Sequence, residues 1–214
     1  MMKNFPATLK SFPFGEYRVQ AYVPDAAALQ HWYTSAKEKN VNTPFPYWAK
    51  VWPASLALCK FITEQPHYIQ NKKVLELAAG LGLPSMLSSQ FATEVTCSDY
   101  LNDAVEIMQT SIEENKLLNV HSHLLDWNHL PADLKTDVLL LSDINYDPEV
   151  FELLFQLIDA FITAGTTILL ATPQRIMAKP FIERLMKYCL LHKEIEIKEN
   201  EMKTICSVLV LKSK

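Results

Sequence analysis

The strongest constraint on the fold is the regular alternation of short apolar runs with segments of helical periodicity, from Lys72 onward. The apolar runs have the length of buried strands, and the segments between them are long enough for helices. The runs are 73–79, 94–99, 121–127, 137–143, 166–172, 194–198 and 204–211. A parallel sheet covered by helices on both faces produces this alternation. We therefore predict an α/β fold with a seven-stranded, mostly parallel sheet.

Three connecting segments have clear helical signals. Between the second and third runs, apolar residues fall on one helical stripe, namely Leu101, Ala104, Val105, Met108 and Ile112. Asp147 is placed to cap a helix that begins at Pro148, and a further helix begins around Pro180. The last two runs are separated only by 199–203. This short spacing predicts a C-terminal antiparallel hairpin at the end of a Rossmann-like sheet.

The N-terminal third has a weaker pattern. Residues 17–23 alternate like a strand, Asp25 can cap a helix that runs through Lys37, and 40–48 has the composition of a loop. No low-complexity linker separates this part from the rest. We predict one domain, in which residues 1–71 form an extension that packs on a pocket at the carboxyl edge of the sheet, and residues 72–214 form the core.

Composition limits the partners and the compartment. The formal net charge of −4 offers no general attraction to a phosphate backbone, so we expect no nucleic-acid partner. The four cysteines lie far apart, and no histidine, including His121 and His123, has companions at the spacing of a metal site. No apolar run approaches the length of a membrane span or a signal sequence. We expect a cytoplasmic monomer without a metal or a membrane partner.

The segment from Val74 to Pro84 has the pattern of a strand that enters a turn of small residues and then a helix. Gly80 and Gly82 lack a Cβ, so a ligand can approach the backbone N–H groups of the turn closely. Asp99 ends the next strand, where a carboxylate can accept hydrogen bonds from both hydroxyls of a ribose. Together these features predict a nucleoside pocket.

Two residues favour S-adenosylmethionine over NAD as the nucleoside. A dinucleotide site needs a third glycine for close packing of the helix over a pyrophosphate, and this chain has Ser85 there. Glu76, just before the turn, would repel a pyrophosphate but can help to hold a cationic or amine-bearing ligand, directly or through water.

Leu75 to Pro84 also resembles the first motif of class I methyltransferases, with Ala78 at a position where glycine is common. Four further segments resemble the seven-strand protein-lysine methyltransferases that act on calmodulin, elongation factors, chaperones and the electron-transfer flavoprotein β-subunit. They are 47–55, 98–100, 125–127 and 143–146. The resemblance spans about residues 44 to 175 and implies a protein substrate and S-adenosylmethionine as cofactor.

The resemblance also implies where the cofactor lies. It places Trp52 at the border of the cofactor, Asp99 on the ribose, and Asp126 with Trp127 beside the adenine. The full set of implied cofactor contacts is Trp52, Glu76, Ala78, Gly80, Gly82, Asp99, Tyr100, Asp126, Trp127 and Asp143. For either tryptophan considered alone, core packing is the favoured interpretation, and the alternative for Asp126 is a loop cap.

Asp143 and Tyr146 are the candidate catalytic residues. They lie at the carboxyl end of the fourth core run and resemble the acidic-x-x-aromatic motif of the lysine-methylating family. Asp143 would orient the substrate ammonium or the cofactor, and Tyr146 would line the methyl-transfer channel through cation–π and hydroxyl contacts. We therefore predict a methyltransferase that modifies lysine side chains of a protein.

Several alternatives stay open at this point. A small-molecule amine N-methyltransferase, similar to the nicotinamide enzyme, shares most of the cofactor logic. A nucleic-acid amino-methyltransferase ranks third, because Ile144 and Asn145 replace the prolines of its motif. An NAD-dependent oxidoreductase lacks its third glycine, and a non-catalytic partner-binding module would have a broken cofactor site. Arg175, after the fifth run, is interpreted as a solvated loop residue.

Overall fold

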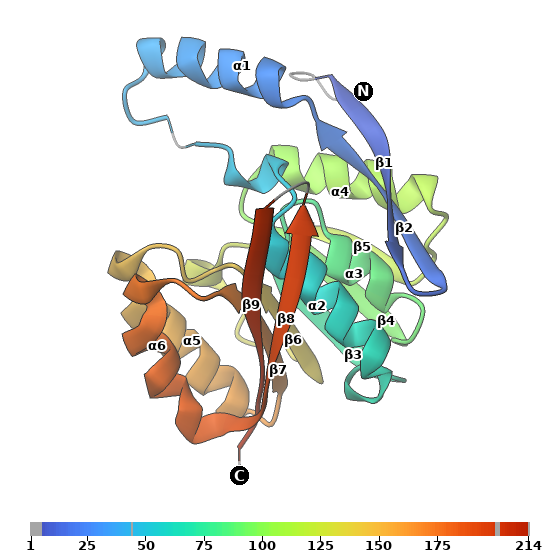
Figure 1. The fold of residues 1–214 in the computed structure, drawn as a ribbon, viewed down its shortest axis with the longest axis vertical. Coiled ribbons are helices and arrows are strands. Elements are labelled where there is room, and N and C mark those ends of the chain that lie inside the picture. The colour runs from blue at the N-terminus through green and yellow to red at the C-terminus, as the bar shows by residue number, and fades with distance from the viewer. Residues whose placement is uncertain (1–5, 44, 200–201, 214) are drawn as a thin grey trace.

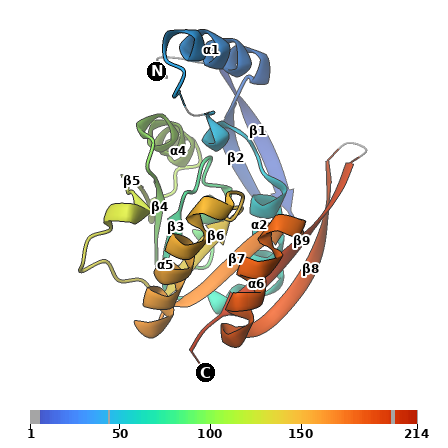
Figure 2. The same cartoon turned by 90° about the vertical axis from the view of Figure 1, so that its left-hand side faces the viewer.

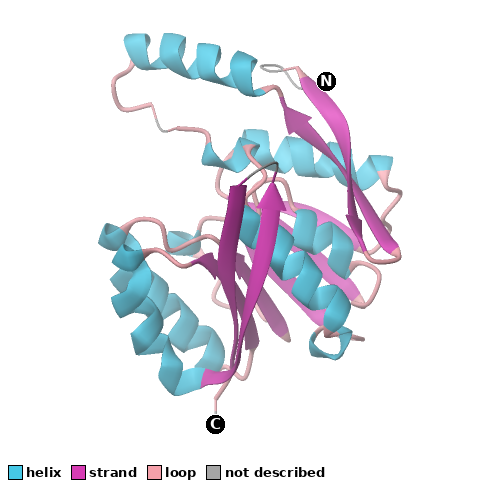
Figure 3. Ribbon diagram, in the orientation of Figure 1, coloured by secondary structure: helices cyan, strands magenta, loops and turns pink. Residues whose placement is uncertain are grey.

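The computed structural model describes residues 6–43, 45–199 and 202–213. Its centre is a seven-stranded sheet with the strand order β5-β4-β3-β6-β7-β9-β8 (Figures 1 and 3). The parallel strands are β3 (Lys73–Leu77), β4 (Glu94–Asp99), β5 (Val120–Leu124), β6 (Val138–Ser142) and β7 (Thr167–Pro173). The last two strands, β8 (Cys189–Glu199) and β9 (Met202–Leu211), form an antiparallel hairpin, and β9 pairs with β7 in antiparallel orientation.

This sheet confirms the predicted fold class. All seven apolar runs contain a strand, although β8 begins at Cys189, before the predicted start at residue 194. The earlier start has a physical reason: β8 is an edge strand whose first half alternates between exposed and partly buried residues, so no continuous apolar run marks it. Residues 200–201 of the predicted connection lie outside the described residues.

Helices cover both faces of the sheet (Figures 1 and 2). One face packs against α2 (Pro53–Glu64), α3 (Leu83–Ser88) and α4 (Asn102–Glu114), and the other against α5 (Phe151–Thr163) and α6 (Lys179–Leu185). Side chains alternate along each strand between these two cores. Val74 and Leu140 face the first group of helices, whereas Leu75 and Leu139 face the second.

The N-terminal part forms a separate two-stranded hairpin and a helix. Strands β1 (Ala7–Phe14) and β2 (Tyr17–Pro24) pair in antiparallel orientation, and α1 (Ala26–Lys39) follows. The Asp25 side chain accepts a hydrogen bond from the backbone N–H of Ala28 at 2.8 Å, as expected of a helix cap. The hairpin is tied to α4, where the Ser111 hydroxyl accepts from the backbone N–H of Tyr22 at 3.0 Å. Helix α1 lies at one end of the molecule (Figure 1).

Helix α2 shows that residues 1–71 are not all an extension. Leu58 and Phe61 of this helix are fully buried in the same core as Val74 of the central strand β3. The helix therefore belongs to the layer that covers the sheet, although it precedes residue 72. Within the described part of the chain, no helix combines the length and the apolar character needed to cross a membrane.

Candidate active site

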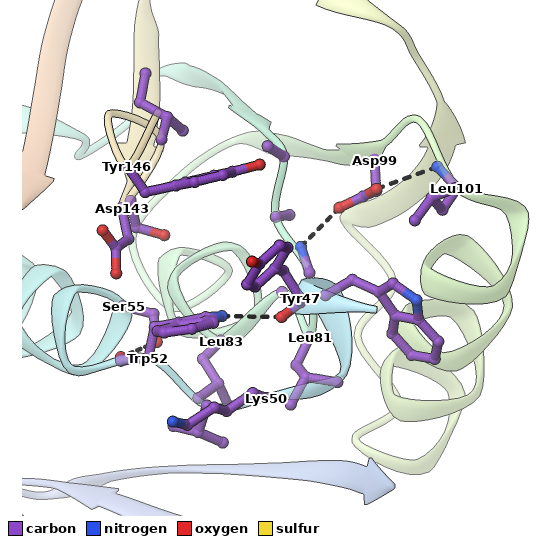
Figure 4. Close-up of a pocket in the computed structure, with 18 of the residues that line it drawn as sticks. Tyr47, Lys50, Trp52, Ser55, Leu81, Leu83, Asp99, Leu101, Asp143 and Tyr146 are labelled. Atoms are coloured by element: carbon purple, nitrogen blue, oxygen red, sulfur yellow. Dashed lines mark hydrogen bonds between the residues drawn. The ribbon is translucent and has the colours of Figure 1, made fainter. Parts of the chain in front are cut away.

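A cavity of about 290 Å³ lies at the carboxyl ends of the parallel strands (Figure 4). Its wall comes from the loops that follow β3, β4, β5, β6 and β7, together with the segment 45–55. The central strand β3 has β4 on one side and β6 on the other, so the chain order reverses beside it. Open α/β sheets bind their ligands at such a reversal point.

The turn after β3 forms the floor of the cavity. Gly80 and Gly82 have φ angles of +57° and +69°, in the left-handed region, and Gly82 is the N-cap of α3. A Cβ added at Gly80 would lie 3.0 Å from the carbonyl oxygen of Trp48. The glycine therefore allows the N-terminal segment to close onto the turn. Ala78 also has a positive φ of +52°, which is unfavourable for a residue with a side chain.

Asp99 is the acidic residue of the cavity wall. One carboxylate oxygen accepts from the N–H of Gly80 at 3.1 Å, and the other accepts from the N–H of Leu101 at 3.1 Å. Burial raises the pKa of Asp99, and these hydrogen bonds partly offset that rise. Each oxygen retains a lone pair, so the group can accept two further hydrogen bonds from a ligand in the cavity.

Glu76 lies behind the turn and is absent from the cavity wall. Its fully buried carboxylate accepts hydrogen bonds from the N–H and the hydroxyl of Ser85, at 2.9 and 2.6 Å, through one oxygen. The other oxygen has no hydrogen-bond partner among the described residues. Burial raises the pKa of Glu76 to about 8. This carboxyl group supports the turn from behind.

Asp143 and Arg175 form an ion pair in the wall of the cavity. The two guanidinium nitrogens donate to the two carboxylate oxygens, Nη1 to Oδ1 and, at 3.0 Å, Nη2 to Oδ2. The pair raises the pKa of Arg175. Arg175 is thus a cavity residue, and its interpretation as a solvated loop arginine was wrong. A signal existed, because Asp143 and Arg175 follow strands that both end at this edge of the sheet.

Tyr47, Trp52 and Tyr146 form a group of neighbouring aromatic rings in the wall of the same cavity. The ring centroids of Tyr47 and Tyr146 are 5.3 Å apart, and those of Tyr47 and Trp52 are 6.1 Å apart. The indole N–H of Trp52 donates to the carbonyl of Tyr47 at 2.9 Å (Figure 4). Lys50 places its ammonium 4.8 Å from the centroid of the Trp52 ring. Tyr47 belongs to the segment 47–55, which resembles the lysine-methylating family, but it was not predicted as a site residue.

The loops after β4 and β5 complete the wall. Tyr100 and Trp127 line the cavity, whereas Asp126 does not. The carboxylate of Asp126 accepts from the N–H of Asn128 at 2.9 Å and caps the short turn Trp127–His129. This hydrogen bond lowers the pKa of Asp126. Of the implied cofactor contacts, Glu76 and Asp126 therefore lie outside the cavity wall. Over the described ranges, no three potential metal ligands cluster closely enough to hold an ion.

Residues 44–188 match the sequence profile of a family described as lysine methyltransferase. The chain belongs to this family. That match confirms the resemblance found in the sequence. The curated relatives include proteins named for arginine and for lysine as the methyl acceptor. The chain spans about half the length of the histone-arginine methyltransferases that it matches.

Two of these relatives illustrate the range. A human protein named histone-arginine methyltransferase METTL23 is 32% identical over 108 residues, which cover 48% of this chain and 57% of that protein. The Xenopus tropicalis protein named protein N-lysine methyltransferase METTL21A is 29% identical over 144 residues, which cover 65% and 66%.

Solved structures support the fold. The Thermus thermophilus 16S rRNA N2 G1207 methyltransferase, in complex with AdoMet and guanosine, superposes with a TM-score of 0.65 and 16% identity, over 97% of this chain and 51% of that one. The N-methyltransferase NodS of Bradyrhizobium japonicum, bound to S-adenosyl-L-homocysteine, has a TM-score of 0.60 and 11% identity, over 84% and 97%. At these identities the likeness shows the Rossmann-like methyltransferase fold alone.

Proposed function

We propose that this protein is an S-adenosylmethionine-dependent methyltransferase that modifies lysine side chains of a protein substrate. The observation that carries the proposal is one cavity with two chemically different halves. The half beside β3 and β4 contains the glycine turn and Asp99, and the half beside β6 contains Tyr47, Trp52 and Tyr146. The family membership and the relatives named as lysine methyltransferases agree with it.

The residues of the first half fit the cofactor. Asp99 has lone pairs available for the two ribose hydroxyls, and the left-handed glycines hold the turn so that a ligand can lie against its backbone. Tyr100 and Trp127 offer ring faces for the purine. When bound, S-adenosylmethionine would supply a methyl group on a positively charged sulfur. A nucleophile would take this methyl group, and the sulfur would leave as a neutral thioether.

The residues of the second half suit an alkylammonium. The faces of Tyr47 and Tyr146 can hold a cation through cation–π contacts, as the Trp52 ring already does with the Lys50 ammonium. A lysine amine must lose a proton before it attacks, because its ordinary pKa is ~10.4. Removal from water inside an aromatic wall favours the neutral amine, and the hydroxyl of Tyr146 can accept a hydrogen bond from it. Burial raises the pKa of Tyr146, so this hydroxyl stays protonated.

The half of the cavity that contains Tyr47, Trp52 and Tyr146, called the acceptor side below, suits a protein substrate better than a small amine. The residues Tyr47 and Tyr146 on this side are 47% and 45% exposed. A site for a small amine would enclose most of its ligand, whereas a lysine on a protein surface must enter from outside. A cytoplasmic location and the absence of a nucleic-acid partner are also part of this proposal, supported by buried thiols at Cys59, Cys97 and Cys206 and by the net charge of −4.

The test is isothermal titration of the purified protein with S-adenosylmethionine and with NADH. We expect micromolar binding of the methyl donor, no binding of NADH, and loss of donor binding in Asp99→Ala. Asp103→Ala is the matched control, because Asp103 lies nearby in the first turn of α4 but outside the cavity wall. Radiolabelled methyl transfer to lysate proteins, followed by acid hydrolysis, should then yield methyl-lysine. Absence of donor binding by the unmodified protein would refute the cofactor assignment.

A further inference from the structure

We propose that Arg175 determines which cation the acceptor side accepts: by occupying Asp143, it admits an alkylammonium and excludes a guanidinium. This inference rests on the proposed function and names a specificity-determining residue for it. The choice between lysine and arginine as acceptor matters for this chain, because its relatives are named for both.

The first step is the state of Asp143. Its side chain is only 5% exposed, and both carboxylate oxygens accept from the guanidinium of Arg175. The backbone of Asp143 is also held, since its N–H donates to the carbonyl of Ala171 at 2.9 Å. Because Arg175 already uses both carboxylate oxygens, Asp143 cannot bind a second guanidinium in the same bidentate way.

The second step concerns the other carboxylates. Besides Asp143, the cavity wall contains only Asp99, within the described residues. Each Asp99 oxygen accepts one backbone hydrogen bond, and under the proposed function its remaining lone pair accepts from a ribose hydroxyl of the bound cofactor. A guanidinium entering the cavity would thus find no carboxylate able to receive its planar fork. Its donors would be buried without partners, which weakens binding strongly.

The third step is what remains for an ammonium. A lysine ammonium is a compact charge that needs no planar partner, and the rings of Tyr47 and Tyr146 offer it π faces. The Trp52 ring already has the Lys50 ammonium 4.8 Å from its centroid. The Arg175 side chain is 28% exposed and lies in the cavity wall, where its charge is paired with that of Asp143. The same ion pair therefore leaves the ammonium site intact and closes the guanidinium site.

The experiment uses n-butylammonium and n-propylguanidinium as side-chain probes, titrated by NMR into the full chain saturated with S-adenosylhomocysteine. The unmodified protein should bind n-butylammonium at least about tenfold more tightly than n-propylguanidinium. In Arg175→Gln, the released carboxylate of Asp143 should raise the affinity for n-propylguanidinium by about tenfold or more. In the double variant Arg175→Gln/Asp143→Asn, this gain should disappear.

Competition separates two sources of such a gain. If n-propylguanidinium gains affinity at the acceptor side, n-butylammonium must displace it. Binding that n-butylammonium does not displace would mean that the probe merely fills the volume left by Arg175, and this result would overturn the inference. Equal binding of both probes by the unmodified protein would overturn it as well, as would a gain that survives in the double variant.

Folding and cofactor binding are checked separately. Affinity for S-adenosylhomocysteine is measured first, and its absence in the unmodified protein counts against the proposed function rather than against the role of Arg175. If Arg175→Gln does not fold, Arg175→Lys replaces it, because lysine keeps the charge but makes a single point contact with Asp143. In Arg175→Lys the affinity for n-propylguanidinium should rise by about threefold, and an unchanged affinity would refute the proposal.

Discussion

The buried carboxyl group of Glu76 predicts an unusual dependence of stability on pH. Burial raises its pKa from an ordinary 4.5 to about 8, so folding disfavours the ionised form. The penalty is absent below about pH 4.5, where the group is protonated in both states. It grows as the pH rises, because the unfolded chain then releases a proton that the folded protein retains, and it is complete above about pH 8. Stability from this group is thus lost as the pH rises.

The substitution Glu76→Gln isolates the effect. A glutamine carbonyl can accept the two hydrogen bonds from Ser85, at 2.9 and 2.6 Å, and it never ionises. One pKa unit corresponds to about 1.4 kcal/mol, so the variant should gain roughly 2–3 kcal/mol relative to the unmodified protein between pH 5 and pH 7. Urea unfolding at several pH values measures this difference, because the other titrating groups cancel between the two proteins.

The matched control is Glu94→Gln, which removes a carboxyl group that is 47% exposed on the neighbouring strand β4. The stability difference between this variant and the unmodified protein should change by less than about 0.5 kcal/mol over the same range, because an exposed group loses little hydration on folding. If the difference for Glu76→Gln is constant between pH 5 and pH 7, the carboxyl group ionises in the folded state at its ordinary pKa, and the reasoning is refuted.

Three further substitutions test the turn beside the cavity and the core beneath α2. Gly80→Ala should lower the free energy of unfolding by about 1–3 kcal/mol in urea titrations and weaken calorimetric S-adenosylmethionine binding, because its φ is +57° and its Cβ would meet the Trp48 carbonyl at 3.0 Å. Ala78→Gly should raise the unfolding free energy by up to about 1 kcal/mol in the same titrations, since it removes left-handed strain at φ +52°; a lower value would count against strain there. Leu58→Ala should cost about 2–5 kcal/mol by thermal and urea unfolding, because this side chain is fully buried.

The sequence predicted the sheet most clearly at its central strands, because these are buried on both faces. Strands β6 and β7 consist almost wholly of buried residues, so they stand out as continuous apolar runs. The same logic located the glycine turn and Asp99, since the carboxyl ends of parallel strands meet at one edge. Strand β1 was missed, because its exposed and partly buried residues give no such run, and α2 was missed although its apolar face is buried.

The placement of Glu76 follows from strand geometry that the motif alone does not convey. Side chains alternate along β3, so Glu76 shares a face with Val74, and Val74 packs in the core beneath α2 and α3. The carboxyl group therefore meets Ser85 of α3 and not the cavity. A position next to a ligand-binding turn in sequence can lie behind that turn in space.

The contact between Asp143 and Arg175 depends on two further facts that spacing along the chain does not encode. Their strands, β6 and β7, are neighbours in parallel register, with Ser142 opposite Ala171, which places the loops after them side by side. Asp143 also has a φ of +57°, a conformation that aspartate tolerates better than most residues. This left-handed residue turns the chain away from the sheet where β6 ends, as Ala78 does after the adjacent strand β3. Backbone strain thus collects where the two central strands enter the cavity, and it aims the carboxylate at its arginine.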